Sequence, residues 1–140
     1  MKKIFNLSLW LNQSMQDLVK KIINTIDIHK NVENHSFYIT FITADCNVII
    51  PDDLKEKYPE SMTIVLEHQF EKLKTTNDGF FITLFFSGNP KNLFIPYNSI
   101  INIFDKNSDF EVSLDYTPSK IKKSKTTPVS KKDNIIIFPK

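Results

Sequence analysis

The hydrophobic pattern changes once along the chain, from a helical repeat to short alternating segments, and this change constrains the fold most. A single apolar stripe with spacings of three and four predicts a helix from about Ser14 to Ile28. From His35 onward apolar and polar residues alternate, as in "HSFYITFI" and "MTIVLEHQF" (62–70), which is typical of half-buried strands. No helix separates successive strands, so a parallel sheet is excluded.

Later segments extend the same pattern. Asn77-Asp78-Gly79 is a strong hairpin signal, and "FFITLFFS" after it is apolar on both faces, which predicts a strand that is central or covered on both sides. "NLFIP", "SIINIF" and "FEVSLDY" follow as shorter candidate strands. The sequence therefore predicts a mainly β domain with an N-terminal α-helix, arranged as a small antiparallel β-sandwich or a partly open, SH3- or Sm-like barrel.

The apolar stripe of the predicted helix has two interpretations. In the first, it only covers the core of its own domain. In the second, the stripe is wider than one small domain needs, and part of it packs against a second copy of the chain. The sequence alone leaves both open. The stripe residues, which form the predicted dimer interface, are Met15, Leu18, Val19, Ile22, Ile23 and Ile26.

The net charge of the chain changes sign after Tyr116. Residues 1–116 hold 11 Lys against 15 Asp and Glu, a net of −4, whereas residues 117–140 hold 7 Lys against one Asp, a net of +6. Together these account for the formal net charge of +2. The basic residues are concentrated in the tail, so the overall charge does not indicate a nucleic-acid-binding face on the domain.

The tail itself has two parts. Residues 117–133 contain six lysines and two prolines but too few apolar residues to bury, which predicts a disordered, flexible linker. Residues 134–140, "NIIIFPK", either fold back as an edge strand or form a short linear motif for a partner, and the composition favours the motif. We therefore divide the chain into a domain (1–116), a linker (117–133) and a terminal peptide (134–140).

Residue patterns for catalysis, cofactors or metals are sparse. His29, His35 and His68 have no cysteine or carboxylate at metal-ligand spacing, and two glycines cannot make a phosphate-binding loop. The single Cys46 permits no internal disulfide. The apolar runs are far shorter than the ~20 residues that cross a bilayer, and the start lacks a signal-cleavage site. We expect a cytoplasmic protein that is not an enzyme and needs no cofactor or metal.

Two blocks, "LKEKYPESMTIVLEHQF" (54–70) and "FSGNPKNLFIPYNSIINIFD" (86–105), resemble the alphaproteobacterial branch of the stringent starvation protein B (SspB) adaptors. "FYITF" (37–41) and "SMQDLVKKIINTI" (14–26) are similar to the same family. Two departures stand out. Glu67 replaces a glutamine that is usual in the family's "LQHQF" strand, and Pro139 restricts Phe138 to extended geometry.

The resemblance implies a homodimer that binds the C-terminal ssrA degradation tag of stalled-ribosome products. It also implies delivery of the tagged protein to ClpX, the unfoldase of the ClpXP protease. The N-terminal helix is implied at the dimer interface, with the tag extended in an apolar groove on each subunit. The residues implied to dock on the zinc-binding N-terminal domain of ClpX are Ile135, Ile136, Ile137, Phe138, Pro139 and Lys140.

Within such a groove, amide donors and apolar walls are expected. Gly88 is a candidate because its missing side chain would let a peptide approach the backbone. For each candidate, an ordinary structural role in the core or in a turn explains the presence of the residue equally well. The complete set of predicted tag-binding residues is Gln69, His68, Phe70, Ile49, Ile50, Phe86, Ser87 and Gly88.

An alternative interpretation comes from another class of protein. A small Sm-like barrel with a lysine-rich tail would bind RNA through phosphate contacts, and its binding would weaken steeply with salt. The net charge of −4 on residues 1–116 and the apolar end of the tail argue against this interpretation.

Overall fold

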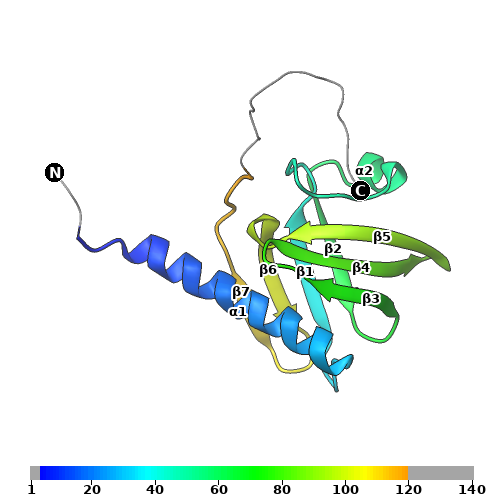
Figure 1. The fold of residues 1–140 in the computed structure, drawn as a ribbon, viewed down its shortest axis with the longest axis horizontal. Coiled ribbons are helices and arrows are strands. Elements are labelled where there is room, and N and C mark those ends of the chain that lie inside the picture. Colours follow the sequence, from blue (N-terminus) through cyan, green and yellow to red (C-terminus); the bar gives the residue numbers. More distant parts are fainter. Residues whose placement is uncertain (1–3, 120–140) are drawn as a thin grey trace.

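One long helix lies across two antiparallel β-sheets in the computed structural model, which describes residues 4–119 (Figure 1). The predicted fold class, mainly β with an N-terminal helix, is confirmed. The terminal peptide 134–140 and most of the predicted linker lie outside the described residues. The elements are α1 (Leu7–His29), β1 (Phe37–Ile42), α2 (Asp52–Lys57), β2 (Ser61–Leu66), β3 (Phe70–Thr75), β4 (Gly79–Phe86), β5 (Asn89–Pro96), the 3-10 helix η1 (Tyr97–Ser99), β6 (Ile100–Asp105) and β7 (Phe110–Ser113).

The two sheets have the strand orders β2-β1-β6-β7 and β3-β4-β5, and all pairings are antiparallel. The core lies between them and includes Phe41 from β1 and Phe80 from β4, both fully buried. β2 and β3 are consecutive in the chain but belong to different sheets. Residues 67–69 therefore carry the chain from one sheet to the other, and they lie at the candidate site described below.

The alternation predicted for β1 is confirmed, whereas the single strand predicted over residues 62–70 is wrong. β2 ends at Leu66, and Phe70 begins β3. A continuous strand would have placed His68 on the buried face with Leu66, but His68 is exposed. Because burying an unpartnered imidazole is costly, the chain leaves the sheet at three consecutive polar residues.

The predicted hairpin at Asn77-Asp78-Gly79 is confirmed, since it joins β3 to β4. The backbone N–H of Thr76 donates to the carbonyl of Gly79 at 2.8 Å. A Cβ atom at Gly79 would lie 2.4 Å from the carbonyl oxygen of Ile95 on β5. Only glycine allows this close approach of β4 to β5.

β4 is the central strand of its sheet, which is one of the two alternatives that its apolar sequence predicted. Its inner face is buried, but its outer face is only partly covered. Phe81 is 46% exposed and Phe85 is 36% exposed. The apolar residues on the outer face of β4 therefore meet solvent rather than a second covering layer.

α1 begins seven residues earlier than predicted and ends one residue later, so Ser14 lies inside the helix rather than at its start. Its C-terminal half buries Val19, Ile23 and Ile26 against the sheets. Hydrogen bonds join α1 to both sheets. Thr75 N–H of β3 donates to Asp27 Oδ2 (3.1 Å), and Asp115 N–H after β7 donates to Asn12 Oδ1 (2.8 Å).

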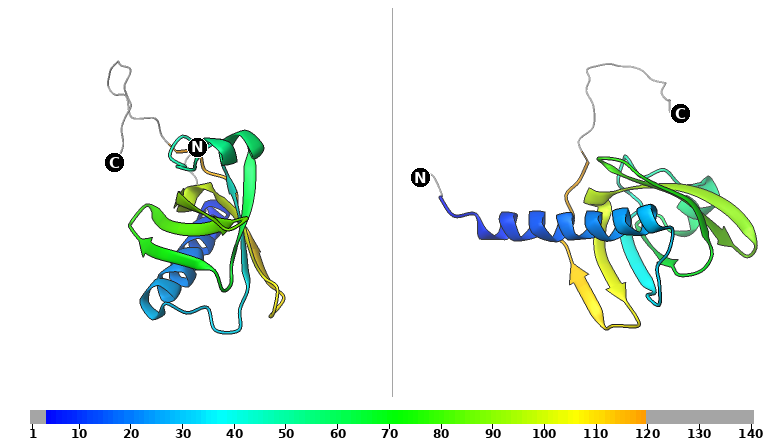
Figure 2. Two further views of the ribbon diagram at one scale, coloured as in Figure 1. Left: turned by 90° about the vertical axis from the view of Figure 1, so that its right-hand side faces the viewer. Right: turned by 60° about the horizontal axis from the view of Figure 1, so that its bottom comes forward.

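The N-terminal half of α1 projects beyond the sheets, as Figure 2 shows. This half carries Leu7, Trp10 and Leu11, which are 67%, 46% and 61% exposed. Just before the helix, the ring of Phe5 lies edge-on to that of Trp10, with the ring centroids 6.2 Å apart. The apolar surface of α1 thus divides into a part that fills its own core and a part that is uncovered.

A buried carboxylate organises the start of β1 and the turn after β6. Asp105, which is 1% exposed, accepts hydrogen bonds from Ser36 N–H (2.9 Å), Ser108 Oγ (2.5 Å) and Asn107 N–H (3.2 Å). The His35 ring lies 2.6 Å from its second oxygen. Burial raises the pKa of the Asp105 carboxyl, but these hydrogen bonds outweigh burial and lower the pKa well below its usual range.

The lowered pKa of Asp105 predicts a pH dependence of stability. Its ionised form stabilises the fold above the pKa of an unfolded aspartate, about 3.9, and this contribution is lost as pH falls through the folded pKa. Asp105→Asn should lower the free energy of unfolding at neutral pH by about 1–3 kcal/mol and flatten its decline below about pH 4. Urea unfolding across pH measures both effects.

Asp109→Asn is the matched control for this experiment. Asp109 is exposed on the same turn, and asparagine accepts its φ of 58°. The control should unfold like the wild type at every pH. An Asp105→Asn protein with the pH profile of the wild type would contradict the role given to this carboxylate.

Candidate peptide-binding site

A pocket of about 430 Å³ lies where the chain passes from β2 to β3. One wall is the end of β2, the floor is the crossing segment, and the other wall is the end of β4. This pocket, which we call the crossing pocket, is lined by Thr63, Ile64, Val65, Glu67, His68, Gln69, Leu84, Phe85 and Phe86. Three predicted tag-binding residues, His68, Gln69 and Phe86, are brought together here.

The crossing pocket faces the free edge of β2. Side chains of consecutive strand residues point to opposite faces. Three consecutive residues of β2, Thr63–Val65, nevertheless line the pocket, as expected when it lies along the strand edge. β2 pairs with β1 on its other side and, within residues 4–119, forms the end of its sheet. An edge of this kind presents backbone donors and acceptors to an extended peptide.

The side chains around this edge combine an apolar wall with a polar rim. Phe85 is 36% exposed, and Phe86 is half-buried and packs against the core. Glu67, His68 and Gln69 are exposed on the crossing segment. Such a site can hold an extended segment through backbone hydrogen bonds, while the aromatic rings bind apolar side chains and Gln69 supplies an amide.

The turn after β4 contains Ser87 and Gly88, with φ angles of 52° and 81°. Two successive positive φ angles are typical of a two-residue hairpin turn, and they favour glycine at this position. A Cβ atom at Gly88 would meet no neighbouring atom within 4 Å. The turn geometry thus accounts for Gly88, and its proposed role in peptide approach stays a prediction.

The remaining candidates lie elsewhere. Phe70, at the start of β3, lines a neighbouring pocket of about 480 Å³ that shares Glu67 and His68 with the crossing pocket. Ile49 forms a backbone bridge with Phe94 of β5 and does not line the crossing pocket. Phe94 pairs with Phe81, five residues before Phe86 on β4, which places it about 16 Å away along the strand.

Ile50 is half-buried and packs against the core. Ile50 also lines neither of the two pockets beside the crossing segment. Ile49 and Ile50, which we predicted as wall residues, thus do not line the pocket that contains Gln69 and Phe86. Val65 and Phe85, which do line the crossing pocket, are residues that sequence reasoning missed.

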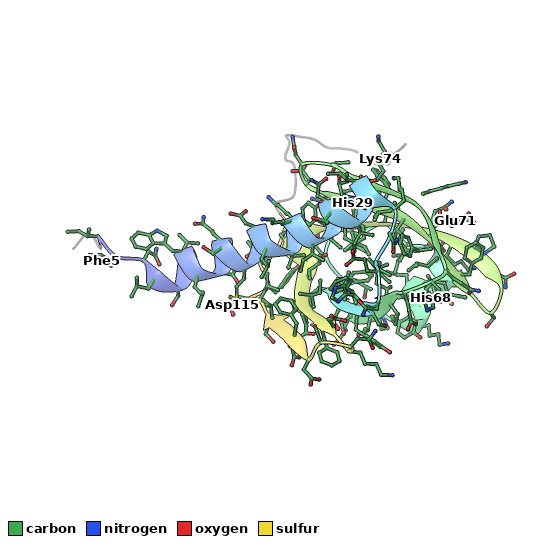
Figure 3. All side chains as sticks on the ribbon, turned by 90° about the horizontal axis from the view of Figure 1, so that it is seen from below. Phe5, His29, His68, Glu71, Lys74 and Asp115 are labelled. Atoms are coloured by element: carbon green, nitrogen blue, oxygen red, sulfur yellow. The ribbon has the colours of Figure 1, made fainter. Side chains whose placement is uncertain are left out.

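The stripe residues of α1 also lie in different environments. Val19, Ile23 and Ile26 are buried in the core of their own chain, Met15 and Ile22 are half-buried, and Leu18 is 36% exposed. The uncovered apolar surface continues from Leu18 toward the projecting end of the helix. Figure 3 shows Phe5 at that end, on the opposite side of the molecule from His68.

Other chemistry is limited in the described residues. Cys46 is exposed, and partial burial of its thiol together with the nearby Asp45 raises the pKa of Cys46, which weakens it as a nucleophile at neutral pH. Between residues 4 and 119, no three His, Cys, Asp or Glu side chains are grouped to hold a metal ion. None of the helices in this range is both long and apolar enough to span a membrane.

Within residues 4–119, two packed antiparallel sheets leave an open pocket beside a strand edge, and an edge of this kind can accept an extended peptide as an added strand. The chain belongs to the stringent starvation protein B (SspB) family, whose model matches residues 10–135. This match confirms the family resemblance in the sequence, and the proteins of this family are adaptors in proteolysis. No match was found among curated proteins.

Proposed function

We propose that this protein is a cytoplasmic adaptor that binds ssrA-type degradation tags and tethers the tagged proteins to ClpX for degradation by ClpXP. The observation that supports it most directly is the crossing pocket, where a strand edge without a partner in residues 4–119 meets the rings of Phe85 and Phe86 in a member of an adaptor family. The role requires binding and release, and a pocket open to solvent is suited to both.

In this proposal the tag lies extended along the edge of β2. Its backbone bonds to residues 63–65, its apolar side chains pack on Phe85 and Phe86, and Gln69 contributes an amide hydrogen bond. Glu67 adds a negative charge to the rim. The terminal carboxylate of a tag would be repelled there, so we place it away from Glu67, toward Lys or backbone amide donors.

We propose further that the protein is a homodimer held together by the projecting half of α1. Leu7, Trp10 and Leu11 form an exposed apolar surface there, and large exposed patches of this kind mark interaction sites. Leu18 and Ile22 continue the same surface toward the domain. Two such helices packed together would remove these residues from water, with a gain of about 25 cal/mol for each Å² of apolar surface buried.

The terminal peptide 134–140 is proposed to dock on the N-terminal domain of ClpX. The residues concerned lie outside the described part of the chain, and the support is their composition and the family. Joining the tag contact to the ClpX contact makes the second binding step intramolecular. Linkage of this kind raises avidity by about 10²–10⁴ without any new contact.

Substitutions in the crossing pocket should weaken binding of a labelled ssrA-type peptide. Phe85→Ser should reduce affinity about tenfold, because an aromatic contact of about 1.4 kcal/mol is lost. Gln69→Ala should reduce it severalfold, the effect of one hydrogen bond. Fluorescence anisotropy measures these changes, with a scrambled peptide and Gln13→Ala on α1 as controls. Unchanged affinity in both pocket variants would remove the crossing pocket as the tag site.

Leu11→Glu should dissociate the dimer, because it places an unpaired charge in the proposed apolar interface. Sedimentation should give a monomer with a wild-type circular dichroism spectrum. Gln13→Glu is the control, since two residues turn the helix by about 200° and place this charge on the opposite side. Ile23→Glu should instead unfold the domain, because Ile23 is fully buried. A wild-type protein that is monomeric at micromolar concentration would contradict the proposed dimer.

Removal of residues 120–140 should separate the two binding activities. The shortened chain keeps every described element and should bind the tag peptide normally, but it should not accelerate ClpXP degradation of a tagged substrate at low concentration. Ile136→Asp with Phe138→Asp should give the same loss in the full chain, because charge abolishes an apolar anchor. Full acceleration by the shortened chain would exclude the tail as the ClpX-docking segment.

A further inference from the structure

A second apolar surface lies on the outer face of the β3-β4-β5 sheet, away from the crossing pocket. The rings of Phe81 and Phe94 lie with centroids 4.6 Å apart and a tilt of 48°. Ile49 is joined to Phe94 by two backbone hydrogen bonds of 3.1 and 2.9 Å. Phe81 is 46% exposed and Ile49 is 52% exposed. We call these three residues the outer strip, and neither the tag site nor the dimer proposed above uses it.

The last described residues of the chain lie beside this strip. A groove of about 650 Å³ has Ile49, Phe94 and Pro96 on one side and the segment Thr117–Ser119 on the other. Two of the three strip residues, Ile49 and Phe94, therefore share one groove with the base of the tail. The tail leaves the domain at the edge of an apolar surface that has no cover within residues 4–119.

A buried carboxylate fixes this exit point. Asp45, which is 2% exposed, accepts hydrogen bonds from Tyr116 Oη (2.7 Å) and from the backbone N–H and Oγ of Ser119 (2.9 and 2.5 Å). Asn98 Nδ2 donates to the Thr117 carbonyl at 2.7 Å. We call this set of bonds the Asp45 clasp. The clasp holds the beginning of the tail against the domain, so the tail starts from a defined position next to the outer strip.

We propose that the apolar end of the tail, residues 135–138, docks on the outer strip of its own chain. The composition of residues 120–134 predicts a coil whose ends lie about 20 Å apart, enough to return to a groove that begins at Ser119. The sequence Ile-Ile-Ile-Phe matches the strip in chemistry. The net charges of +6 on residues 117–140 and −4 on residues 1–116 also favour the tail lying near its domain.

Because the terminal peptide and the outer strip belong to one chain, even a weak contact between them is enough to populate the docked state. A flexible linker of this length gives an effective concentration in the millimolar range. A strip that binds the free peptide with only millimolar affinity would thus be occupied in about half of the molecules. Docking of this kind keeps an apolar peptide out of water and competes with any partner that binds the same peptide.

This inference goes beyond the proposed tethering role, because it assigns the tail a second binding site on its own domain. In the proposed adaptor, ClpX would have to displace the tail from the strip before docking it. The self-docked form would therefore lower the apparent affinity for ClpX in proportion to its population.

Nuclear magnetic resonance of the full chain tests the docking. The backbone amide signals of Ile49, Phe81 and Phe94 should differ between the wild type and a chain with Ile136→Asp and Phe138→Asp. A free peptide with the sequence of residues 134–140, added to that double variant, should restore the wild-type positions. The matched control is Thr127→Asp with Val129→Asp, which adds the same charge within the linker and should leave the strip signals unchanged.

Three results would overturn the proposal. The first is identical strip signals in the wild type and in the chain altered at Ile136 and Phe138. The second is a difference that disappears on dilution, which would mean that the strip binds the tail of another copy. The third is a response of the strip signals to the ssrA-type peptide alone, which would make the strip part of the tag site.

A binding experiment separates this inference from the adaptor proposal. Phe81→Ser should free the tail, so the full-length variant should bind the isolated N-terminal domain of ClpX about twofold more tightly than the wild type. Phe104→Ser, a half-exposed aromatic position on the other sheet, is the control. If no variant binds ClpX but the spectral difference persists, the adaptor proposal fails and self-docking stands. If the wild type binds ClpX and Phe81→Ser binds it equally tightly, self-docking is wrong.

Discussion

Packing of the C-terminal half of α1 over the two sheets is the interaction on which the rest of the structure depends. Val19, Ile23 and Ile26 fill the core, and hydrogen bonds at Asn12 and Asp27 join the helix to one sheet and then the other. A helix fixed along this length cannot also bury its first turns against the same domain. The projecting apolar half of α1 is therefore a consequence of how the core is closed, and the proposed dimer rests on this half of the helix.

The candidate site has a similar origin in the sheet arrangement. β2 and β3 belong to different sheets and are joined by three residues, so the edge of β2 lies beside the crossing segment and has no strand partner within residues 4–119. The outer face of β4 reaches the crossing pocket at Phe85 and the outer strip at Phe81, so one strand contributes aromatic rings to two separate surfaces. In the proposed adaptor, these two surfaces would hold a cargo peptide and the tail at different places on one small domain.

The elements with alternating buried residues could be predicted from the sequence, and those governed by distant pairing could not. Phe37, Ile39 and Phe41 identify β1, whereas β3 buries little besides Leu73 and contains a bulge near Lys72, whose φ is 56°. His68, Gln69 and Phe86 could be chosen from family patterns. Val65 and Phe85 depend on where β2 ends, and the place of Ile49 depends on its bridge to Phe94, a contact that local periodicity does not contain.

The Asp45 clasp also determines how a force applied to the tail would enter the domain. In the described part of the chain, β7 is an edge strand that pairs only with β6, and a load applied directly to it would separate their ladder one bond at a time. The clasp diverts the load at Tyr116 and Ser119 into the loop after β1 before it reaches β7. A force on the tail would therefore strain a few hydrogen bonds to Asp45 first, and the β6-β7 ladder only after those bonds break.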